Sequence, residues 1–404
     1  MAAKYFGKNM YPVLRLKPGK ESTVLQRHPW IFSGALMDIP NEIPHGSLVS
    51  VADSAGNIIA TGTLSNRTTI AVRAFEFGPA TIDAGWIREK MARANDYRRF
   101  LGFGIDNITT GFRLVYGESD MLPGLVVDRY KDVLVIQIST KGMDLMRDII
   151  IGVLIDQFRP AAIVERSDLN VRREEGLEDI ISVCYGALRE EVEFTENGRK
   201  YLADIWKGQK TGFYLDQKDL RNLVGKLSRG KKVLNLFSYS GGFGVAALAD
   251  GARTVHNIDS SEAALALCMR NAELNGFAPE SMTTLCADVF QYLSGDGNED
   301  YDMVVIDPPA LIKAKGNFEA GRKAHHFLNR AAMRLVKDGG FFVTSSCSSF
   351  FNEEDLLVTL RRASVQNNLR LDLRYSVRQS PDHPISIYFP ESYYLKSLIC
   401  QVRK

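Results

Sequence analysis

From Trp206 onward, short apolar segments alternate with helical segments, and this rhythm constrains the fold more than any other feature of the sequence. The apolar segments are residues 231–239, 253–261, 283–290, 301–309 and 339–348. Strands this apolar, alternating with helices, are typical of a parallel sheet that helices cover on both faces. Ligands bind such sheets at the carboxyl ends of the strands. We therefore predict an α/β domain with a mostly parallel sheet and look for functional residues where its strands end.

The sequence ahead of Trp206 follows other patterns. Residues 12–77 hold short apolar or alternating runs separated by Gly, Pro and Asn, which predicts a small β-barrel or sandwich. Apolar residues then recur at helical spacing, as Ile87, Met91, Ala94, Tyr97 and Leu101. Residues 113–204 mix strands with a helix over 143–158. We predict a small β domain (1–78), a helical linker joining two domains (79–108), a central α+β domain (109–200) and the α/β domain (201–404).

Composition narrows the class of protein. Of the 404 residues, 45% are hydrophobic and 24% are charged, and neither a leader nor an apolar stretch of roughly 20 residues occurs. We therefore expect a cytoplasmic protein without a membrane partner. The five cysteines have no metal-ligand spacing, so we expect free thiols and no metal. Residues 1–77 hold eight Lys and Arg against five acids, which fits a solvated face and a nucleic-acid surface equally.

A Gly-rich turn follows the first strand of the α/β domain. Gly241, Gly242 and Gly244 stand between that strand and a helix. Glycine lets the backbone approach a ligand, and a helix start offers free N–H groups. A tight structural turn explains the same glycines nearly as well.

Acidic residues end the next two strands. Asp259 is placed to accept hydrogen bonds from both hydroxyls of a ribose. Asp288 is placed to accept from an adenine amino group, with Val289 or Phe290 packed on the ring. Either acid alone fits an ordinary cap or turn residue. Three successive strand ends of this kind favour a nucleoside cofactor.

The motifs together resemble a known family. The Gly-rich turn, the ribose acid, "ADVF" and "DPP" in this order resemble class I S-adenosylmethionine-dependent methyltransferases. The motifs "RHPWIFSGA", "GESDMLPGLVVDRY", "KTGFYLDQKDLR", "LFSYSGGFG" and "SSCSS" are similar to those of the ribosomal RNA large subunit methyltransferase I family, over nearly the whole chain. The resemblance implies an RNA-binding PUA domain, a central α+β domain and a Rossmann-like methyltransferase domain. It implies S-adenosyl-L-methionine as cofactor, large-subunit rRNA as partner and 5-methylcytosine as product.

The resemblance also assigns residues. It makes Cys347 of "SSCSS" the nucleophile that adds to cytosine C6, because the addition makes C5 nucleophilic. Without the motif, Cys347 fits a small core residue, as we assign Cys184, Cys268, Cys286 and Cys400. Asp307 of "DPP" is expected to hydrogen-bond the N3/N4 edge of the cytosine. Relatives commonly carry a lysine and an aromatic residue after this motif, where Ala310 and Leu311 stand here.

Two further groups complete the candidate site. The expected cofactor neighbours are Phe237, Tyr239, Gly241, Gly242, Asp259, Asp288, Val289, Asp307, Tyr214 and Gln217, with Asp216 as a further candidate. The expected RNA-binding residues are Arg27, His28, Trp30 and Lys210, although Trp30 equally fits the core of the β domain. His325 and His326 are expected on a solvated helix face.

Two other functions fit parts of the sequence. "DPP" also resembles motifs of methyltransferases that act on an exocyclic amine of a purine, which need no nucleophilic cysteine. A noncatalytic RNA-binding or ribosome-assembly factor would keep the same fold as a scaffold, but the intact glycines and both nucleoside acids argue against it. The sequence leaves open whether the chain forms a homodimer.

Overall fold

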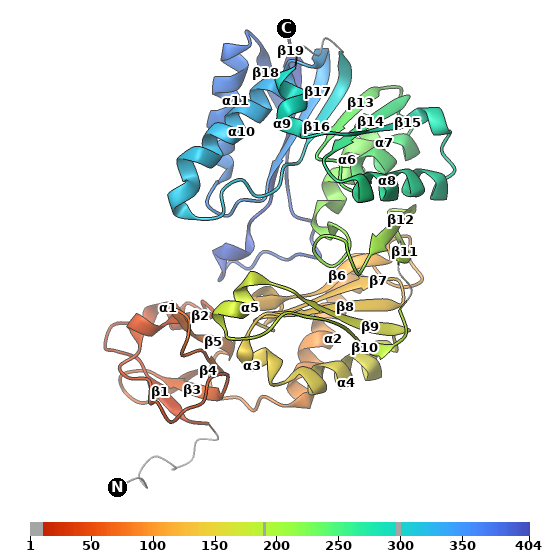
Figure 1. Cartoon of the computed structure of the whole chain (residues 1–404). Coiled ribbons are helices and arrows are strands. Elements are labelled where there is room, and N and C mark those ends of the chain that lie inside the picture. Colours follow the sequence, from red (N-terminus) through yellow and green to blue (C-terminus); the bar gives the residue numbers. More distant parts are fainter. Residues whose placement is uncertain (1–10, 189–190, 296–299) are drawn as a thin grey trace, which may run out of the picture. The chain divides into compact units, whose positions relative to one another are not determined.

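The protein is described by a computed structural model that covers residues 11–188, 191–295 and 300–404. The chain forms two compact units (Figure 1). The first unit runs to Val192 and also takes in Asp204–Lys207 and Pro381–Ser392. The second unit consists of Glu193–Ala203, Gly208–Ser380 and Tyr393–Lys404. A segment late in the sequence, residues 381–392, therefore belongs to the first unit. The domain boundaries drawn above stay predictions.

The first unit begins with a small five-stranded sheet. Its strands lie in the order β1-β3-β4-β5-β2, and only β1 and β3 pair in parallel. The elements are β1 (Val13–Arg15), α1 (Ser22–Leu25), β2 (Trp30–Phe32), β3 (Leu48–Ala52), β4 (Ile58–Leu64) and β5 (Ile70–Glu76). Val49, Val51, Ala60 and Val72 are fully buried in its core. This confirms the predicted all-β segment.

A second five-stranded sheet follows in the same unit, in the order β10-β9-β8-β7-β6. Only β8 and β9 pair in parallel. The strands are β6 (Gly111–Tyr116), β7 (Leu125–Tyr130), β8 (Val133–Ile138), β9 (Ala162–Ser167) and β10 (Ile180–Gly186). The helices are α2 (Ala84–Phe100), α3 (Lys141–Asp144), α4 (Arg147–Phe158) and α5 (Asn170–Glu174). The predicted mixture of strands and helices is confirmed.

Helix α2 shows how local sequence and packing combine. It begins after Asp83, whose Oδ1 accepts a hydrogen bond from the Trp86 N–H at 2.9 Å, as expected of an N-cap. Ile87, Met91 and Ala94 form its buried stripe. This stripe joins the same hydrophobic core as β6, β7 and β8. The helix expected to link two domains is thus an integral part of the first unit.

The second unit is built on a seven-stranded sheet in the order β15-β14-β13-β16-β17-β19-β18. The strands are β13 (Lys232–Leu236), β14 (Thr254–Asp259), β15 (Met282–Cys286), β16 (Tyr301–Ile306), β17 (Val336–Ser346), β18 (Arg370–Arg378) and β19 (Lys396–Arg403). The first five of these are parallel, and β19 pairs antiparallel with β17 and β18. The predicted mostly parallel sheet is confirmed, and the carboxyl ends of its parallel strands meet at one edge.

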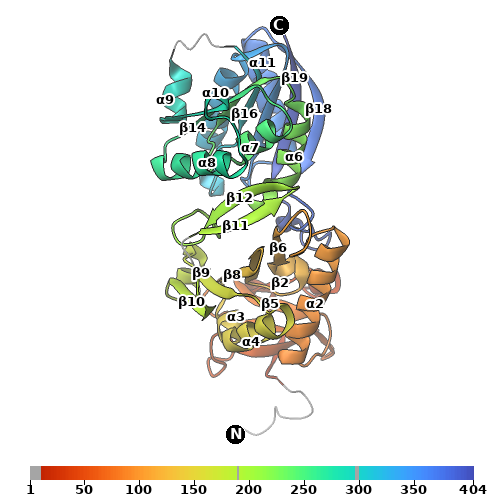
Figure 2. The same ribbon diagram turned by 90° about the vertical axis from the view of Figure 1, so that its right-hand side faces the viewer.

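Helices cover both faces of this sheet. They are α6 (Lys218–Leu227), α7 (Gly242–Ala249), α8 (Glu262–Leu274), α9 (Val289–Ser294), α10 (Phe318–Met333) and α11 (Glu353–Gln366). Helices α10 and α11 lie on one side of the sheet, and α7 and α8 lie on the other (Figure 1). The side with α7 and α8 faces the viewer in Figure 2. A hairpin of β11 (Glu191–Glu196) and β12 (Arg199–Asp204) precedes the sheet. None of the helices in the described ranges is both long and apolar enough to span a membrane.

Candidate active site

The Gly-rich turn after β13 is held in the left-handed region of backbone conformation. Phe237, Tyr239 and Gly241 have φ angles of 56°, 48° and 76°. This region costs a non-glycine residue on the order of 1 to 3 kcal/mol, and such strain concentrates at functional sites. Glycine is required at 241 for a second reason, because a Cβ atom there would lie 2.3 Å from Cys268 Sγ. Cys268 is fully buried, as predicted.

The same turn keeps capacity for a polar ligand. The hydroxyl groups of Ser238 and Ser240 are buried and have no hydrogen-bond partner among the described residues. Gly242 opens α7 directly after the turn. Unpaired hydroxyl groups beside a close-approaching glycine backbone fit the amino-acid and ribose groups of S-adenosylmethionine.

The two predicted nucleoside acids lie at the ends of adjacent strands. Asp259 is half-buried and accepts hydrogen bonds from the Tyr239 N–H at 2.8 Å and the Ser261 N–H at 2.9 Å. Asp288 is exposed and caps α9, where its Oδ1 accepts from the Gln291 N–H at 2.9 Å. Each acid therefore has the structural role that the simpler interpretation assigned to it. Each carboxylate oxygen has a second lone pair, so both acids still fit hydroxyl or amino groups of a nucleoside.

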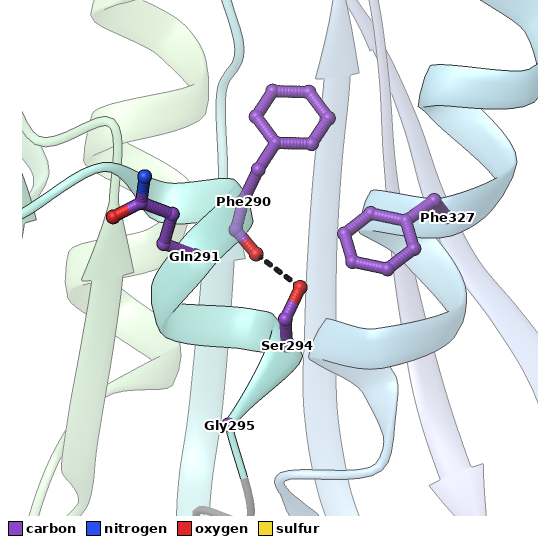
Figure 3. Close-up of a pocket in the computed structure, with 5 residues that line it drawn as sticks. All are labelled: Phe290, Gln291, Ser294, Gly295 and Phe327. Atoms are coloured by element: carbon purple, nitrogen blue, oxygen red, sulfur yellow. Dashed lines mark hydrogen bonds between the residues drawn. The ribbon is translucent and has the colours of Figure 1, made fainter.

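The two residues after Asp288 have different surroundings, because one is buried in the core and the other lines a pocket. Val289 is buried in the core of the unit. The Phe290 ring stacks on the Phe327 ring of α10 with centroids 5.9 Å apart, and both rings line a pocket of about 590 Å³ with Gln291, Ser294 and Gly295 (Figure 3). The Ser294 hydroxyl donates to the Phe290 carbonyl at 2.7 Å. The contact of Val289 with an adenine ring stays a prediction, and Phe290 packs on Phe327 of α10.

Asp307 lies directly after β16 and is half-buried. Its Oδ1 accepts a hydrogen bond from Gln217 Nε2 at 3.0 Å. Burial, together with the nearby Asp216 carboxylate, raises the pKa of Asp307 to about 7, against the opposing effects of the Gln217 hydrogen bond and of Arg221. The structure thus joins the "DPP" motif to the "YLDQ" motif and produces a carboxyl group that titrates near neutral pH.

Cys347 follows the last residue of β17, the strand beside β16, and is half-buried. Burial raises the pKa of its thiol to about 11; Asp307 and Asp216 act in the same direction, and Lys210 opposes them. Cys347 is therefore within electrostatic range of the "DPP" aspartate and of the "KTGFYLDQ" segment. The site holds a thiol, a carboxyl group and an ammonium group at the strand ends.

The segment over residues 209–217 is fixed to the Gly-rich turn by tyrosines. The Tyr239 hydroxyl accepts from the Gln209 N–H at 3.0 Å, and the Tyr214 hydroxyl donates to the Gln209 side chain. The two tyrosine rings meet edge to face at 5.4 Å. Lys210 is exposed and lies 5.8 Å from the centre of the Tyr214 ring. These contacts bring Tyr214, Tyr239 and Lys210 together, and their role toward the cofactor or RNA stays a prediction.

A buried lysine supports the Cys347 turn, and sequence analysis missed it. Lys396 is 2% exposed on β19, opposite Ser346. Its ammonium group donates to the carbonyls of Ser348 at 2.7 Å and Tyr394 at 2.8 Å. Burial lowers the pKa of Lys396 to about 8, which Cys347 opposes. The sequence signal that could have predicted this burial is the position of a single lysine inside the apolar run "YLKSLIC".

His325 is the second missed residue. It is 1% exposed, so the expected solvated position is wrong for this histidine. Its ring stacks on Phe351 at 4.6 Å, and its Nε2 lies 3.4 Å from the Ser346 hydroxyl. Burial, with Lys396 nearby, lowers the pKa of His325 to about 4. Its spacing from Gly321, Leu328 and Ala332, all buried on α10, was the signal of an inward face.

The other cysteines differ from the prediction in one case. Cys400 is buried and Cys184 is half-buried, but Cys286 is exposed. The reason is topological, because β15 is an edge strand of the seven-stranded sheet. Its thiol lies 3.5 Å from the Ser260 carbonyl.

The expected RNA-binding residues of the small β domain are packed to different degrees. Trp30 is half-buried, and its indole N–H donates to Glu118 at 2.8 Å. His28 Nε2 lies 3.3 Å from Glu391, and its Nδ1 accepts from the Trp30 N–H. Arg27 is exposed. Arg27 is therefore the one exposed residue of these three.

Comparison with known families places both parts of the chain. Residues 172–370 match the family described as S-adenosylmethionine-dependent methyltransferase, and residues 14–77 match that described as PUA-like domain. Among solved structures, the chain is similar to a SAM-dependent methyltransferase from Streptococcus mutans, with a TM-score of 0.81 and 21% identity over 96% of this chain and 100% of that one. At that identity the likeness supports the fold.

Curated relatives match over almost their whole length. Ribosomal RNA large subunit methyltransferase I of Shewanella amazonensis is 36% identical over 96% of this chain and 99% of the relative. The protein of the same name from Klebsiella pneumoniae is 34% identical over 98% of this chain and 99% of the relative. The Gly-rich turn, the strand-end acids and these matches agree, so the chain belongs to the ribosomal RNA large subunit methyltransferase I family and uses S-adenosylmethionine as its cofactor.

Proposed function

We propose that the protein transfers a methyl group from S-adenosylmethionine to C5 of a cytosine in large-subunit ribosomal RNA. Family membership supports the RNA, since the relatives carry that substrate in their name. The choice of base rests on one observation: the Cys347 thiol and the Asp307 carboxyl interact at the ends of adjacent parallel strands. Methylation of an exocyclic amine has no use for this thiol.

The cysteine supplies the nucleophile. S-adenosylmethionine, when bound, supplies an electrophilic methyl group, but cytosine C5 is too weak a nucleophile to take it unaided. The Cys347 sulfur forms a bond to C6, which makes C5 an enamine-like carbon that accepts the methyl group. Loss of the C5 proton then restores the C5–C6 double bond and breaks the bond between C6 and sulfur. Cys347 leaves as a thiolate and regains its proton as cytosine N3 gives up the one it held during the addition, while the C5 proton passes to water.

Asp307 is suited to move the proton that this addition requires. At neutral pH its carboxylate accepts the thiol proton of Cys347 and donates it to cytosine N3, where negative charge develops as sulfur adds to C6. A pKa of about 7 matches a group that both accepts and donates a proton at this pH. The Gln217 hydrogen bond at 3.0 Å fixes the orientation of the carboxyl group.

Two cations favour the thiolate that attacks. Lys210 acts on Cys347 from the segment before the helix α6 and lowers the pKa of the thiol. Lys396 holds the carbonyl of Ser348, the residue after Cys347, and places a buried ammonium group beside the turn. Lys210 lies near the expected substrate, whereas Lys396 is a positioning residue that acts through Cys347.

The decisive experiment incubates the protein with S-adenosylmethionine labelled in the methyl group and with rRNA from a strain that lacks the modification. Nucleosides are then separated and counted. We expect the label in 5-methylcytidine with the parent protein and none with Cys347→Ala. Cys286→Ala is the matched control and should keep full activity, because Cys286 is exposed on an edge strand, away from Asp307.

Two outcomes would contradict the proposal. One is label in a methylated purine, and the other is 5-methylcytidine that persists in Cys347→Ala. A second assay tests the covalent step alone, with RNA in which 5-fluorocytidine replaces the target. The step that releases Cys347 removes a proton from C5, and a fluorine atom at C5 cannot be removed in this way. The parent protein should therefore stay covalently bound to this RNA under denaturing conditions, and Cys347→Ala should not.

A further inference from the structure

A pocket of about 470 Å³ lies in the first unit and has no part in the chemistry described above. Its walls come from the small β domain, from α2 and from residues 386–389 of the late segment. Arg27, Lys90, Arg93, Met121, Tyr388 and Phe389 are among its lining residues. Pockets of ~300 to 1,000 Å³ are those that enclose small organic groups.

A packed aromatic cluster supports one wall of this pocket. The Trp30 ring meets Phe389 at 4.7 Å, and the His28 ring meets Phe389 at 5.7 Å, both edge to face. The polar atoms of this cluster are engaged, since Trp30 donates to Glu118 and His28 contacts Glu391. Trp30 therefore supports residue 389 from behind and is not one of the residues that line the pocket.

The neighbouring residue Tyr388 has the opposite character. Its side chain is 46% exposed, and the guanidinium carbon of Arg27 lies 5.9 Å from the centre of its ring. Arg27 itself is held at a φ of 63°, an unusual conformation for a residue with a side chain. An exposed aromatic ring with an arginine beside it is the combination that binds unpaired nucleotides, by stacking and by contact with phosphate.

The charges of the pocket suit an anionic ligand at the Arg27 end. Glu76 is paired with Lys90 at 2.7 Å, and Glu118 accepts from the indole of Trp30 at 2.8 Å. Arg93 pairs with Glu89 on the surface of α2. Arg27, in contrast, has no ion pair with any carboxylate of the described residues. Its positive charge is thus left for a ligand.

The late segment is held in the first unit by its own contacts, and its flanking residues are held in the second unit by theirs. Asp382 anchors the segment in the first unit, where its carbonyl accepts from Arg98 at 2.6 Å. The residues that flank the segment both contact Asp216 of the second unit: Ser380 N–H donates to its carbonyl at 2.8 Å and the Tyr394 hydroxyl donates to its carboxylate at 2.6 Å. The ring of Tyr388 therefore belongs to a segment whose two ends meet a neighbour of Cys347.

We propose that this pocket binds one unpaired nucleotide of the RNA substrate, with its base stacked on Tyr388 and its phosphate at Arg27. The inference rests on the proposed function in so far as RNA is the substrate. It replaces Trp30 by Tyr388 as the stacking residue, so the RNA-binding surface combines the PUA-like domain with a segment from the far end of the sequence. The occupant is a nucleotide of the same RNA other than the target, since the target cytosine must reach Cys347.

The test measures binding of a fluorescein-labelled single-stranded RNA by fluorescence anisotropy. Tyr388→Ala should weaken binding about tenfold, the scale of one lost stack between a base and an aromatic ring. Tyr388→Phe keeps the ring and should bind within about twofold of the parent. Arg27→Gln should weaken binding and lower the slope of log Kd against log salt by about one, as the loss of one phosphate contact predicts.

Calorimetry with S-adenosylmethionine serves as the folding control, because all these variants should bind the cofactor as the parent does. The proposal is wrong if Tyr388→Ala binds RNA like the parent, or if Tyr388→Phe loses as much affinity as Tyr388→Ala. Such a result, together with normal formation of 5-methylcytidine, would refute the role of this pocket in RNA binding and leave the proposed reaction intact. Label in a methylated purine, together with a tenfold loss of RNA affinity in Tyr388→Ala, would refute the proposed reaction and support the role of the pocket.

Discussion

At the scale of single residues, Asp307 shows how one side chain meets opposing demands. In the proposed reaction it must be ionised to take the proton of Cys347 and protonated to serve cytosine N3. Burial and the neighbouring Asp216 carboxylate bring its pKa to about 7, far above that of a free aspartate. The same environment raises the pKa of Cys347, so the last shared proton of the pair resides on sulfur and moves to the carboxylate during the addition.

We predict that the single-turnover rate of the parent falls as the pH drops through about 7, because a neutral Asp307 cannot accept the thiol proton. Asp307→Asn should lower the rate by roughly 10² to 10⁴ and abolish this acid limb. Asp302→Asn is the matched control on the same strand, since Asp302 pairs with Lys337 and lies outside the site. A pH profile of Asp307→Asn that keeps the acid limb would refute the role.

The same pKa shift has a consequence for stability. A carboxyl group whose pKa is raised in the folded state contributes stability below its unfolded pKa, near 4, and that contribution is lost as the pH rises through about 7. Asp307→Asn removes the ionisable group. Its unfolding temperature relative to the parent should therefore increase between pH 4 and pH 8. A difference in unfolding temperature that does not change with pH would show that folding does not raise the pKa of Asp307.

Lys396 is predicted to control the ionisation of Cys347. Lys396→Gln keeps a donor for the two carbonyls but removes the charge, and Lys396→Met removes both. At pH 7, below the pKa of about 8, both variants should hold roughly tenfold less Cys347 thiolate. The measurement is the rate of alkylation of Cys347 by iodoacetamide, followed by peptide mass spectrometry, with Cys286 as internal reference. A Gln variant alkylated as fast as the parent would make Lys396 purely structural.

At the scale of elements, the turn between β13 and α7 suits the predicted cofactor site because two constraints coincide there. Its backbone alternates into the left-handed region at Phe237, Tyr239 and Gly241. Its glycine also lies against Cys268 of α8, so the turn cannot shift without disturbing the packing of a helix. The strand ends thus receive a rigid turn, which suits a site that must hold a ligand in one orientation.

Gly241→Ala should therefore be more damaging than an ordinary substitution at a positive φ. Gly276→Ala is the matched comparison, because Gly276 has a φ of 70° and no atom within 4 Å of an added Cβ. We expect about 1 kcal/mol of lost stability for Gly276→Ala and about 1 to 3 kcal/mol more for Gly241→Ala, measured by urea unfolding. Only Gly241→Ala should also weaken S-adenosylmethionine in calorimetry. Equal losses in both assays would contradict the packing argument.

At the scale of the whole molecule, the chain does not keep its two units separate in sequence. Residues 381–392 fold with the first unit although the sequence on both sides belongs to the second. Arg98 of α2 is fully buried and forms a bidentate ion pair with Asp120 at 2.7 and 2.8 Å. It also donates to the Asp382 carbonyl at 2.6 Å. One arginine therefore holds the late segment to a helix nearly 300 positions earlier.

Arg98→Met should release this segment. Loss of the cation leaves Asp120 without its partner, at a cost of about 3 to 5 kcal/mol, and frees the Asp382 carbonyl. Limited proteolysis should then cut within residues 381–392 faster than in the parent. Arg88→Met is the control, because the pair of Arg88 with Asp156 is solvent-exposed and should contribute less than about 1 kcal/mol. Unchanged cleavage in Arg98→Met would contradict the anchoring role.

The sequence by itself determined the elements and the strand-end motifs. Period-two and helical patterns are local properties, so the small β domain, the mixed central sheet and the parallel sheet were predictable, as was burial of Cys268. The strand patterns also predicted that Asp259, Asp288, Asp307 and Cys347 stand at the ends of strands, because the end of a strand is a local property too. The sequence did not reveal the burial of Lys396 and His325, because a single polar residue in an apolar stripe can face either way.

Only the tertiary structure decided the protonation of the site and the composition of the pocket that we propose binds RNA. A pKa depends on burial and on charges that are distant in sequence, and Asp216 lies 91 positions before Asp307 and 131 before Cys347. Tyr388 meets Arg27 across most of the chain, a contact that no local pattern encodes. Local periodicity fixes which residues face inward, whereas long-range packing fixes which of them meet.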